Sequence, residues 1–179
     1  MKKLINLFFA TIVTISYSQD IPKVEITSEG ISSIVVEIEG KTASELYQKT
    51  LNWIQQVYKN PDEVLKANIK DEMVRFDGFD KSVWSAKVMG LKSSYDVAYT
   101  IEIDFKDGKY RFKWNTREFW VSESSNRAAF TESAFFKKDG SVRNAYVDGK
   151  AEYEATINAM NRLLYNYISG KADKKNDDW

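Results

Sequence analysis

The chain has 179 residues, with 26 basic and 26 acidic side chains and neither cysteine nor histidine. Because these two residue types are missing, Ser-His-Asp and Cys-His nucleophiles and ordinary zinc sites are excluded, which leaves carboxylate chemistry in a paired-acid hydrolase or a calcium site. The balanced charge gives no basis for binding nucleic acid, since phosphate contacts depend on clustered Lys and Arg. We therefore expect no cofactor and no nucleic-acid partner.

The first 18 residues have the pattern of a secretory signal peptide. Lys2 and Lys3 precede an apolar run from Leu4 to Ile15, and Ser16-Tyr17-Ser18 places small residues where a signal peptidase reads the chain. A run of about 12 residues forms roughly 18 Å of helix, too short for a hydrocarbon core of about 30 Å, so we expect no stable membrane span. We predict cleavage at about Ser18/Gln19 and a location in the periplasm or outside the cell.

The chain after this signal has 161 residues, a length typical of one domain. It carries 24 basic and 26 acidic side chains, and without cysteine its stability must come from a packed core. We divide the sequence into a signal peptide at 1–18, a lead-in segment at 19–30, a single domain at 31–169 with a long insertion or loop at 121–149, and a charged tail at 170–179 that we expect to be mobile.

The domain begins with a predicted strand and a predicted helix. β-branched residues are frequent between Ile31 and Glu39, which favours a strand. Thr42 and Glu45 then have the spacing of a capping box, and apolar residues follow on one stripe at helical spacing. This pattern predicts an amphipathic helix over residues 43–59 that ends before Asn60-Pro61.

Residues 64–120 alternate strand-like runs with turn signals. Val64–Ile69, Met73–Phe76 and Val83–Met89 indicate strands. The pattern leaves open whether residues 73–89 form one bulged strand or two. The predicted sheet therefore has three or four antiparallel strands after the first helix.

Asp107-Gly108 is the strongest turn signal and predicts a two-residue type I′ hairpin between strands at 95–105 and 109–120. The register set by this turn pairs Phe105 with Tyr110, Ile103 with Phe112 and Ile101 with Trp114 on one face, and Asp104 with Arg111, Glu102 with Lys113 and Thr100 with Asn115 on the other. The first face is aromatic and β-branched, and the second pairs opposite charges. We expect the first to lie on a core and the second to meet solvent.

Residues 121–149 break this pattern, and a stretch of that length is unusual inside a compact domain. Phe135, Phe136, Asp139-Gly140 and Val142 favour a partial hairpin there. A last helix follows from Asp148-Gly149, with apolar residues at alternating spacings of four and three, and ends at Gly170. Its apolar stripe predicts a core face against the sheet.

The order of elements, β-α-β-β-β(-β)-α, indicates the α+β class, with two helices packed on one face of an antiparallel sheet. The segments that carry a family resemblance are Ile34–Glu39, Thr42–Tyr47 with Trp53, and Lys106–Arg111. They resemble a family of small exported proteins of the Bacteroidetes type, a domain of unknown function with a TBP-like fold. The resemblance covers roughly residues 30–120 and implies a fold and an envelope location, with no established activity. A TATA-binding fold does not itself imply DNA binding, because the charge is balanced and one copy is present.

Five aromatic residues near strand ends or in the long segment are candidates for partner contact. They are Trp84, Phe119, Trp120, Phe135 and Phe136. Core packing is one interpretation of these residues, and an exposed platform for a glycan or peptide partner is the other. Trp53 and Trp114, by contrast, fall on inferred core faces.

These observations favour a non-enzymatic binding or structural domain of the cell envelope. The uncovered sheet face and residues 121–149 are the expected contact surface, and an envelope protein or a glycan is the expected partner. A small-ligand or lipid carrier with a groove between helices and sheet is the alternative. A carboxylate-dependent hydrolase is the third hypothesis, although the candidate acids, Asp71-Glu72, Asp77, Asp80, Asp104 and Asp107, are predicted to lie in turns or on the solvent face.

Overall fold

The computed structural model describes residues 21–88, 90–124 and 126–171. The predicted signal peptide, the start of the lead-in segment and the charged tail after residue 171 lie outside the described residues. The described elements are β1 (Ile26–Thr27), β2 (Gly30–Ile31), β3 (Ile34–Glu37), α1 (Ala43–Val57), α2 (Pro61–Val64), β4 (Leu65–Ile69), β5 (Met73–Val88), β6 (Leu91–Lys106), β7 (Lys109–Val121) and α3 (Val147–Ser169), with short 3-10 turns at Glu132–Phe135 and Asn144–Tyr146. Within these described stretches, no helix is both long and apolar enough to cross a membrane.

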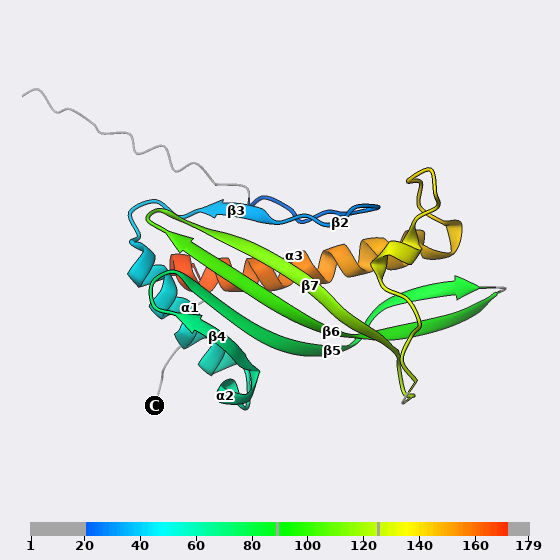
Figure 1. The fold of residues 1–179 in the computed structure, drawn as a ribbon, viewed down its shortest axis with the longest axis horizontal. Coiled ribbons are helices and arrows are strands. Elements are labelled where there is room, and N and C mark those ends of the chain that lie inside the picture. The colour runs from blue at the N-terminus through cyan, green and yellow to red at the C-terminus, as the bar shows by residue number, and fades with distance from the viewer. Residues whose placement is uncertain (1–20, 89, 125, 172–179) are drawn as a thin grey trace, which may run out of the picture.

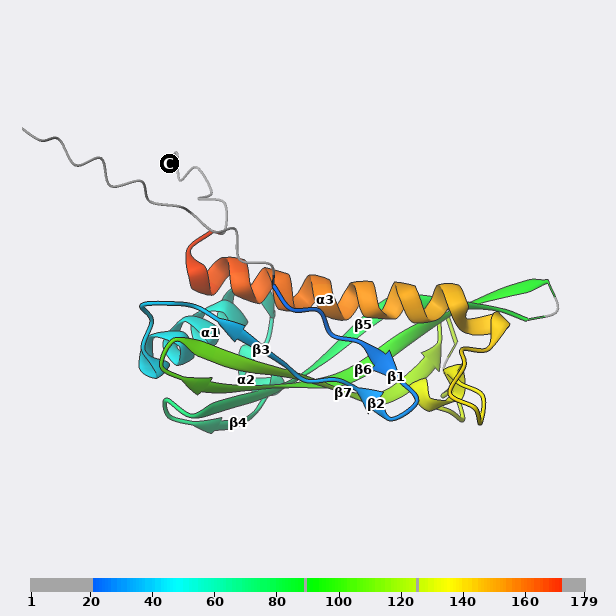
Figure 2. The same cartoon turned by 90° about the horizontal axis from the view of Figure 1, so that it is seen from above.

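Strands β3 to β7 form one antiparallel sheet in the order β3-β7-β6-β5-β4, and β1 and β2 form a separate two-stranded ribbon. Helices α1 and α3 pack on the same face of the five-stranded sheet, as the sequence predicts (Figures 1 and 2). Figure 1 looks onto the opposite face, which neither helix covers. The α+β class and the two-helix arrangement are therefore confirmed.

The hairpin between β6 and β7 has the predicted register. All the expected pairs between residues 100–105 and 110–115 are present. The turn type differs from the prediction, because Gly108 has φ +76° while Asp107 is not among the residues with positive φ, so the turn is not type I′. The turn instead contacts the start of α1. The Asp107 carboxylate accepts a hydrogen bond of 2.8 Å from the Ala43 N–H, and the Gly108 N–H donates to the Lys41 carbonyl at 2.7 Å.

Helix α1 begins with the predicted capping box. The Thr42 hydroxyl accepts from the Glu45 N–H, and the Glu45 carboxylate accepts from the Thr42 N–H at 2.9 Å. The helix ends at Val57, slightly before the predicted boundary, because the next residue is already extended. Its apolar stripe is buried, and Trp53 packs edge-on against Phe76 of β5 with ring centroids 6.0 Å apart.

Residues 73–88 form one bulged strand, which settles the alternative left open by the sequence. The β5–β6 register is irregular between Asp80 and Trp84, and Ser82 in the bulge has φ +51°. The buried carboxylate of Asp96, on β6, accepts hydrogen bonds from the Ser82 N–H at 2.8 Å and from the Ser122 hydroxyl. This acid therefore joins the bulge of β5 to the end of β7.

The long segment after β7 folds back over the strand that precedes it. The Ala128 N–H donates to the Phe119 carbonyl at 2.8 Å, and Trp120 forms an isolated antiparallel bridge with Arg127. The predicted partial hairpin is reduced to a second isolated bridge, between Phe136 and Val142. In Figures 1 and 2 the segment lies toward the end of the molecule opposite α1, and the ends of β5 and β6 project beyond it.

Helix α3 runs along the sheet and approaches β5 very closely at its N-terminal end. A Cβ atom on Gly149 would lie 2.3 Å from the Ser85 carbonyl oxygen, so only glycine fits at this contact. The same helix holds the lead-in segment: the Asn158 side chain accepts from the Val24 N–H at 2.8 Å, and Glu154 accepts from the Ile26 N–H at 2.7 Å. Residues 21–30 are therefore ordered along α3.

The Gly108 turn provides a direct test of the hairpin. Replacing Gly108 by Val should destabilise the protein by about 1–3 kcal/mol, because a β-branched residue is strained at φ +76°. No other residue lies within 4 Å of the position where its Cβ would sit, so the loss would report backbone strain and not a steric clash. Urea denaturation measures the change, and Gly108→Asn, which tolerates positive φ better, should lose less. Equal stability of the Val variant and the parent would contradict the observed turn.

Candidate functional site

The uncovered face of the sheet is the candidate functional site. Along β6, odd-numbered residues from Val97 to Phe105 point into the core and are buried, while even-numbered residues face the open side. This separation follows directly from the two-residue period of a strand. The open face has two parts of different character, a charged half near the Asp107-Gly108 turn and an aromatic half near the end of β7.

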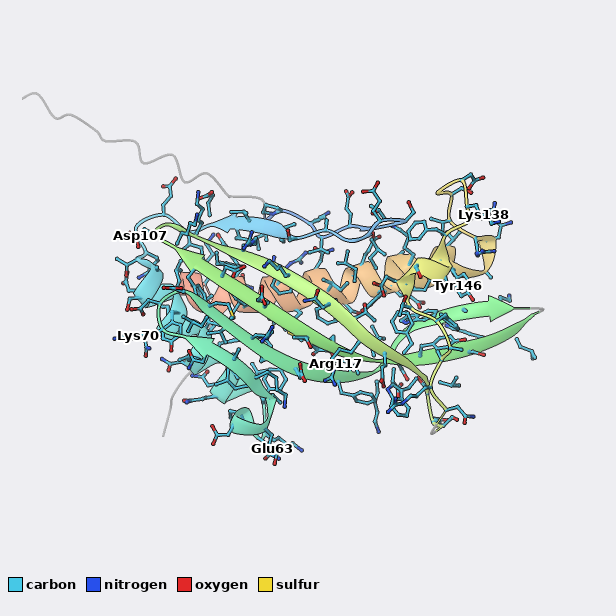
Figure 3. The ribbon with its side chains drawn as sticks, viewed as in Figure 1. Glu63, Lys70, Asp107, Arg117, Lys138 and Tyr146 are labelled. Carbon is cyan, nitrogen blue, oxygen red and sulfur yellow. The ribbon has the colours of Figure 1, made fainter. Side chains whose placement is uncertain are left out.

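The charged half is a network of cross-strand ion pairs that joins β5, β6 and β7. The shortest links are Lys113 to Glu102 at 2.6 Å, Arg117 to Asp77 at 2.6 Å, Arg111 to Asp104 at 2.9 Å and Lys113 to Asp104 at 3.1 Å. Hydrogen bonding to Glu102 raises the pKa of Lys113 above its ordinary value, and so reinforces the charged form. Figure 3 shows Arg117 on this face, in the middle of the sheet.

These ion pairs determine which charged ligands the charged half of the open face can bind. Each of these basic side chains already has an acidic partner, so the surface carries alternating charge and no extended positive patch. A phosphate backbone would have to displace these carboxylates from the basic side chains. The arrangement therefore provides no electrostatic reason for a nucleic-acid ligand, although the fold is TBP-like.

The aromatic half is built from five residues that meet on the same open face. Phe79 of β5 pairs with Ala98 of β6, which pairs with Glu118 of β7, and Trp120 lies two residues beyond Glu118. The guanidinium of Arg127 lies 4.9 Å from the centroid of the Trp120 ring and forms an ion pair of 3.0 Å with Glu118. We call Phe79, Ala98, Glu118, Trp120 and Arg127 the aromatic site. Phe79 is 50% exposed, a high degree for a phenylalanine, at a point where β5 extends beyond its pairing with β4.

The covered face contains a candidate acid, Asp80, in a partly buried environment. The Tyr99 hydroxyl donates a hydrogen bond of 3.1 Å to Asp80, and Tyr58, just after α1, packs beside them. Burial raises the pKa of Asp80 above its ordinary value, and the hydrogen bond from Tyr99 opposes part of that shift. The prediction that Asp80 is a solvent-face or turn acid is therefore wrong, because the strand parity before the bulge directs its side chain inward.

Four of the five predicted contact residues lie inside the protein. Trp84, Phe119 and Phe135 are almost completely inaccessible and Phe136 is 7% exposed, so the expected exposed platform is wrong for these four. The physical reason is that α1 covers only one end of the sheet. At the other end, Phe135 packs against both Trp84 and Phe119, at centroid distances of 4.9 and 6.1 Å, and completes the core.

Trp120 is the one predicted contact residue that the structure brings to the open face. Sequence reasoning did not identify Phe79 and Ala98, its neighbours in the aromatic site. The sequence does indicate that Phe79 faces solvent, because it lies on the same side of the strand as the charged residues Arg75 and Asp77. The contact of Arg127 with Trp120 has no such signal in the sequence, since it depends on how the long segment folds back.

Carboxylates do not gather into a metal centre in the part of the chain that the structure describes. No group of three or more acidic side chains there has the arrangement to hold an ion. Asp80, which is partly buried, has a tyrosine hydroxyl as its hydrogen-bond partner in place of a second carboxylate.

The sheet order, its single covered face and the two helices define an α+β domain of the TBP-like class. Residues 33–120 match the family described as "Domain of unknown function (DUF4468) with TBP-like fold", and this part of the chain belongs to that family. A DUF4468 family protein from Bacteroides ovatus has a similar crystal structure, with a TM-score of 0.60 and 14% identity over 83% of this chain and 90% of that one. A TBP-like protein from Parabacteroides distasonis aligns with a TM-score of 0.53 and 14% identity, over 80% and 92% of the two chains. Among curated proteins, none matches this chain.

The Asp80 environment predicts how stability depends on pH. A raised carboxyl pKa means that the fold favours the protonated acid, so this stabilising contribution is complete below the unfolded pKa and is lost as the pH rises through the folded pKa. Asp80→Asn removes the charge and keeps an acceptor for Tyr99. Its melting temperature relative to the parent should therefore be higher at pH 8 than at pH 4.

The exposed acid Asp62 offers a control, since Asp62→Asn makes the same chemical change at the surface. Thermal unfolding by circular dichroism at both pH values measures all three proteins. A relative melting temperature of the Asp80 variant that falls as the pH rises would show that the carboxylate is stabilised in the fold and contradict the assignment.

Proposed function

We propose that this protein is exported and acts as a non-enzymatic binding domain of the cell envelope, with the uncovered sheet face as its contact surface. The observation that carries the proposal is the aromatic site, where Phe79 is half exposed and Trp120 partly exposed on a face that neither helix covers. An apolar side chain as exposed as Phe79 adds nothing to the core, and aromatic residues supply most of the anchoring energy of protein surfaces.

The predicted location supports the same function. A basic start, a short apolar run and small residues at Ser16 and Ser18 are what export requires. An exported domain without cysteine or histidine lacks the side chains most used in covalent and general-base catalysis. Binding or mechanical support of another envelope component needs neither.

The carrier hypothesis has weaker support, because it needs an apolar groove between the helices and the sheet. That space is filled by buried side chains, among them Leu46, Trp53 and Ile54 from α1. Two clefts of about 560 and 470 Å³ lie instead at the N-terminal end of α3. Their linings contain several charged residues, among them Lys87, Lys92, Asp148 and Glu152 in the first and Glu25, Lys150 and Glu154 in the second.

The hydrolase hypothesis requires two carboxylates held across a cleft, one of them with a raised pKa. Asp80 has the raised pKa, but its partner is Tyr99. Asp148 and Glu152 line one cleft together, yet they lie one turn apart on the same helix, and Glu152 accepts a hydrogen bond from Ser85 at 2.8 Å. Neither group supports glycoside hydrolysis as well as the open face supports binding.

Export has a direct test at the N-terminus. The protein purified from its native host should begin at Gln19 or within about two residues of it, because signal peptidases cut after small residues such as Ser18. N-terminal sequencing, or mass spectrometry of the intact chain, measures the start. A mature protein that retains Met1 would remove the argument for export.

The contact surface is tested by substitution at the aromatic site. The mature protein, immobilised and incubated with an envelope extract, should retain a specific component identified by mass spectrometry. Phe79→Ala combined with Trp120→Ala should reduce its recovery at least roughly tenfold, as expected for removal of two central anchors.

Leu163→Ala is the matched control, because Leu163 is 57% exposed but lies on α3, away from the open face. It should leave recovery unchanged. Circular dichroism confirms that all variants are folded. Equal recovery by the double variant and the control would place the contact surface elsewhere.

A further inference from the structure

We propose that the ligand of the aromatic site is an uncharged glycan chain, bound across strands β5, β6 and β7. This inference rests on the proposed binding function and adds the chemical class of the ligand. It follows from the spacing of the two aromatic side chains, from the way the charges around them are already paired, and from the pairing of β6 with a neighbour on each side between them.

The geometry suits a flat ring laid on the sheet. Phe79 and Trp120 stand on β5 and β7, with β6 between them, so their strands are about 10 Å apart. On β6, Ala98 pairs with Phe79 while Asp96 pairs with Trp120, and the small side chain of Ala98 leaves space beside Phe79 on the side toward β7. A disaccharide spans such a gap, and the C–H faces of its pyranose rings pack against aromatic rings as other apolar groups do.

The polar groups of the site suit hydroxyl groups. Glu118 presents carboxylate oxygens that only accept hydrogen bonds, and Arg127 presents guanidinium N–H groups that only donate them. A sugar with two neighbouring hydroxyl groups can donate to the first and accept from the second at once. Arg127 also lies over the Trp120 ring, so the same contact that fixes the indole places the donors beside it.

The paired charges exclude an ionic ligand. Arg127 is bonded to Glu118 and Arg117 to Asp77, so an anionic polymer would have to compete with a carboxylate for each guanidinium. An uncharged ligand leaves both pairs intact. The charge arrangement of the face therefore complements a neutral polar surface.

An extended peptide is a poorer match. Peptides bind sheets chiefly by adding a strand at an edge, where backbone groups are free. Among the described residues, β4 pairs with β5 only from Met73 to Phe76, so the outer edge of β5 at Phe79 is free, but a strand added there would lie beside β5 and not across β6 and β7. Over β6 and β7, where Ala98 pairs with both Phe79 and Glu118, the aromatic site offers side chains only, which suits a ligand that is recognised through ring faces and hydroxyl groups.

The test uses the mature chain and three uncharged probes, maltohexaose, cellohexaose and chitohexaose, with an oligogalacturonate as the anionic probe. Titrations followed by two-dimensional NMR should show that at least one uncharged hexasaccharide binds and shifts the amide signals of residues 79, 98, 118–120 and 127. Its affinity should stay the same between about 50 and 500 mM NaCl, because no ion pair is formed or broken. Phe79→Ala and Trp120→Ala should each weaken it at least roughly tenfold.

Leu163→Ala is again the control and should bind as the parent does. The proposal is overturned if none of the three uncharged probes binds, if both aromatic variants bind normally, or if the oligogalacturonate binds best and loses affinity in salt. These outcomes are distinguishable from failure of the proposed function. A protein partner captured through Phe79 and Trp120, with no glycan bound, would leave the binding function standing and refute the glycan.

Discussion

The pairing of β6 with β7 through the Asp107-Gly108 turn is the constraint on which the other features depend. A slip of one residue in this pairing would bring Asp104 and Glu102 opposite the aromatic residues of β7 and remove the charge pairs of the open face. The same turn also positions the first helix, because Asp107 accepts from the N–H of Ala43. One short loop thus sets the strand register and anchors the N-terminal end of α1 against the sheet.

The two ends of the core are completed in different ways. Near the turn, α1 supplies the covering side chains, such as Tyr47 against Phe105 at a centroid distance of 6.0 Å. At the far end no second short helix is present among the described elements, and aromatic residues of the long segment take that role. The close contact of Gly149 with Ser85 allows α3 to pack directly on β5, so that this helix covers the core at both ends of the sheet. A loop that looks like an insertion in the sequence is therefore part of the core.

The consequence for function is that the covered and open faces have separate tasks. Burial on the covered face provides the stability that a chain without disulfides needs, with Tyr99 and Trp114 stacked at 3.9 Å near its centre. The open face contributes cross-strand ion pairs, whose individual effect on stability is small at a solvated surface. Folding therefore constrains the composition of the open face less than that of the covered face, which is compatible with the proposed binding site at Phe79 and Trp120.

The sequence alone determined those features whose cause is local. Alternation of apolar and charged residues predicted the β6–β7 register, and the spacing of Thr42 and Glu45 predicted the start of α1, because both signals act between residues that are near in the chain. The turn at Asp107-Gly108 is not type I′, and the Asp107 carboxylate accepts a hydrogen bond from Ala43, which lies 64 positions away in the sequence and which local turn signals do not reveal. The location of Phe135 in the core and of Arg127 over Trp120 likewise depended on how residues 121–146 fold back across β7. Aromatic side chains have the same pattern in a sequence whether they fill a core or line a surface. The tertiary structure alone decided which of them are buried, because α1 covers only one end of the sheet and residues of the long segment complete the core at the other.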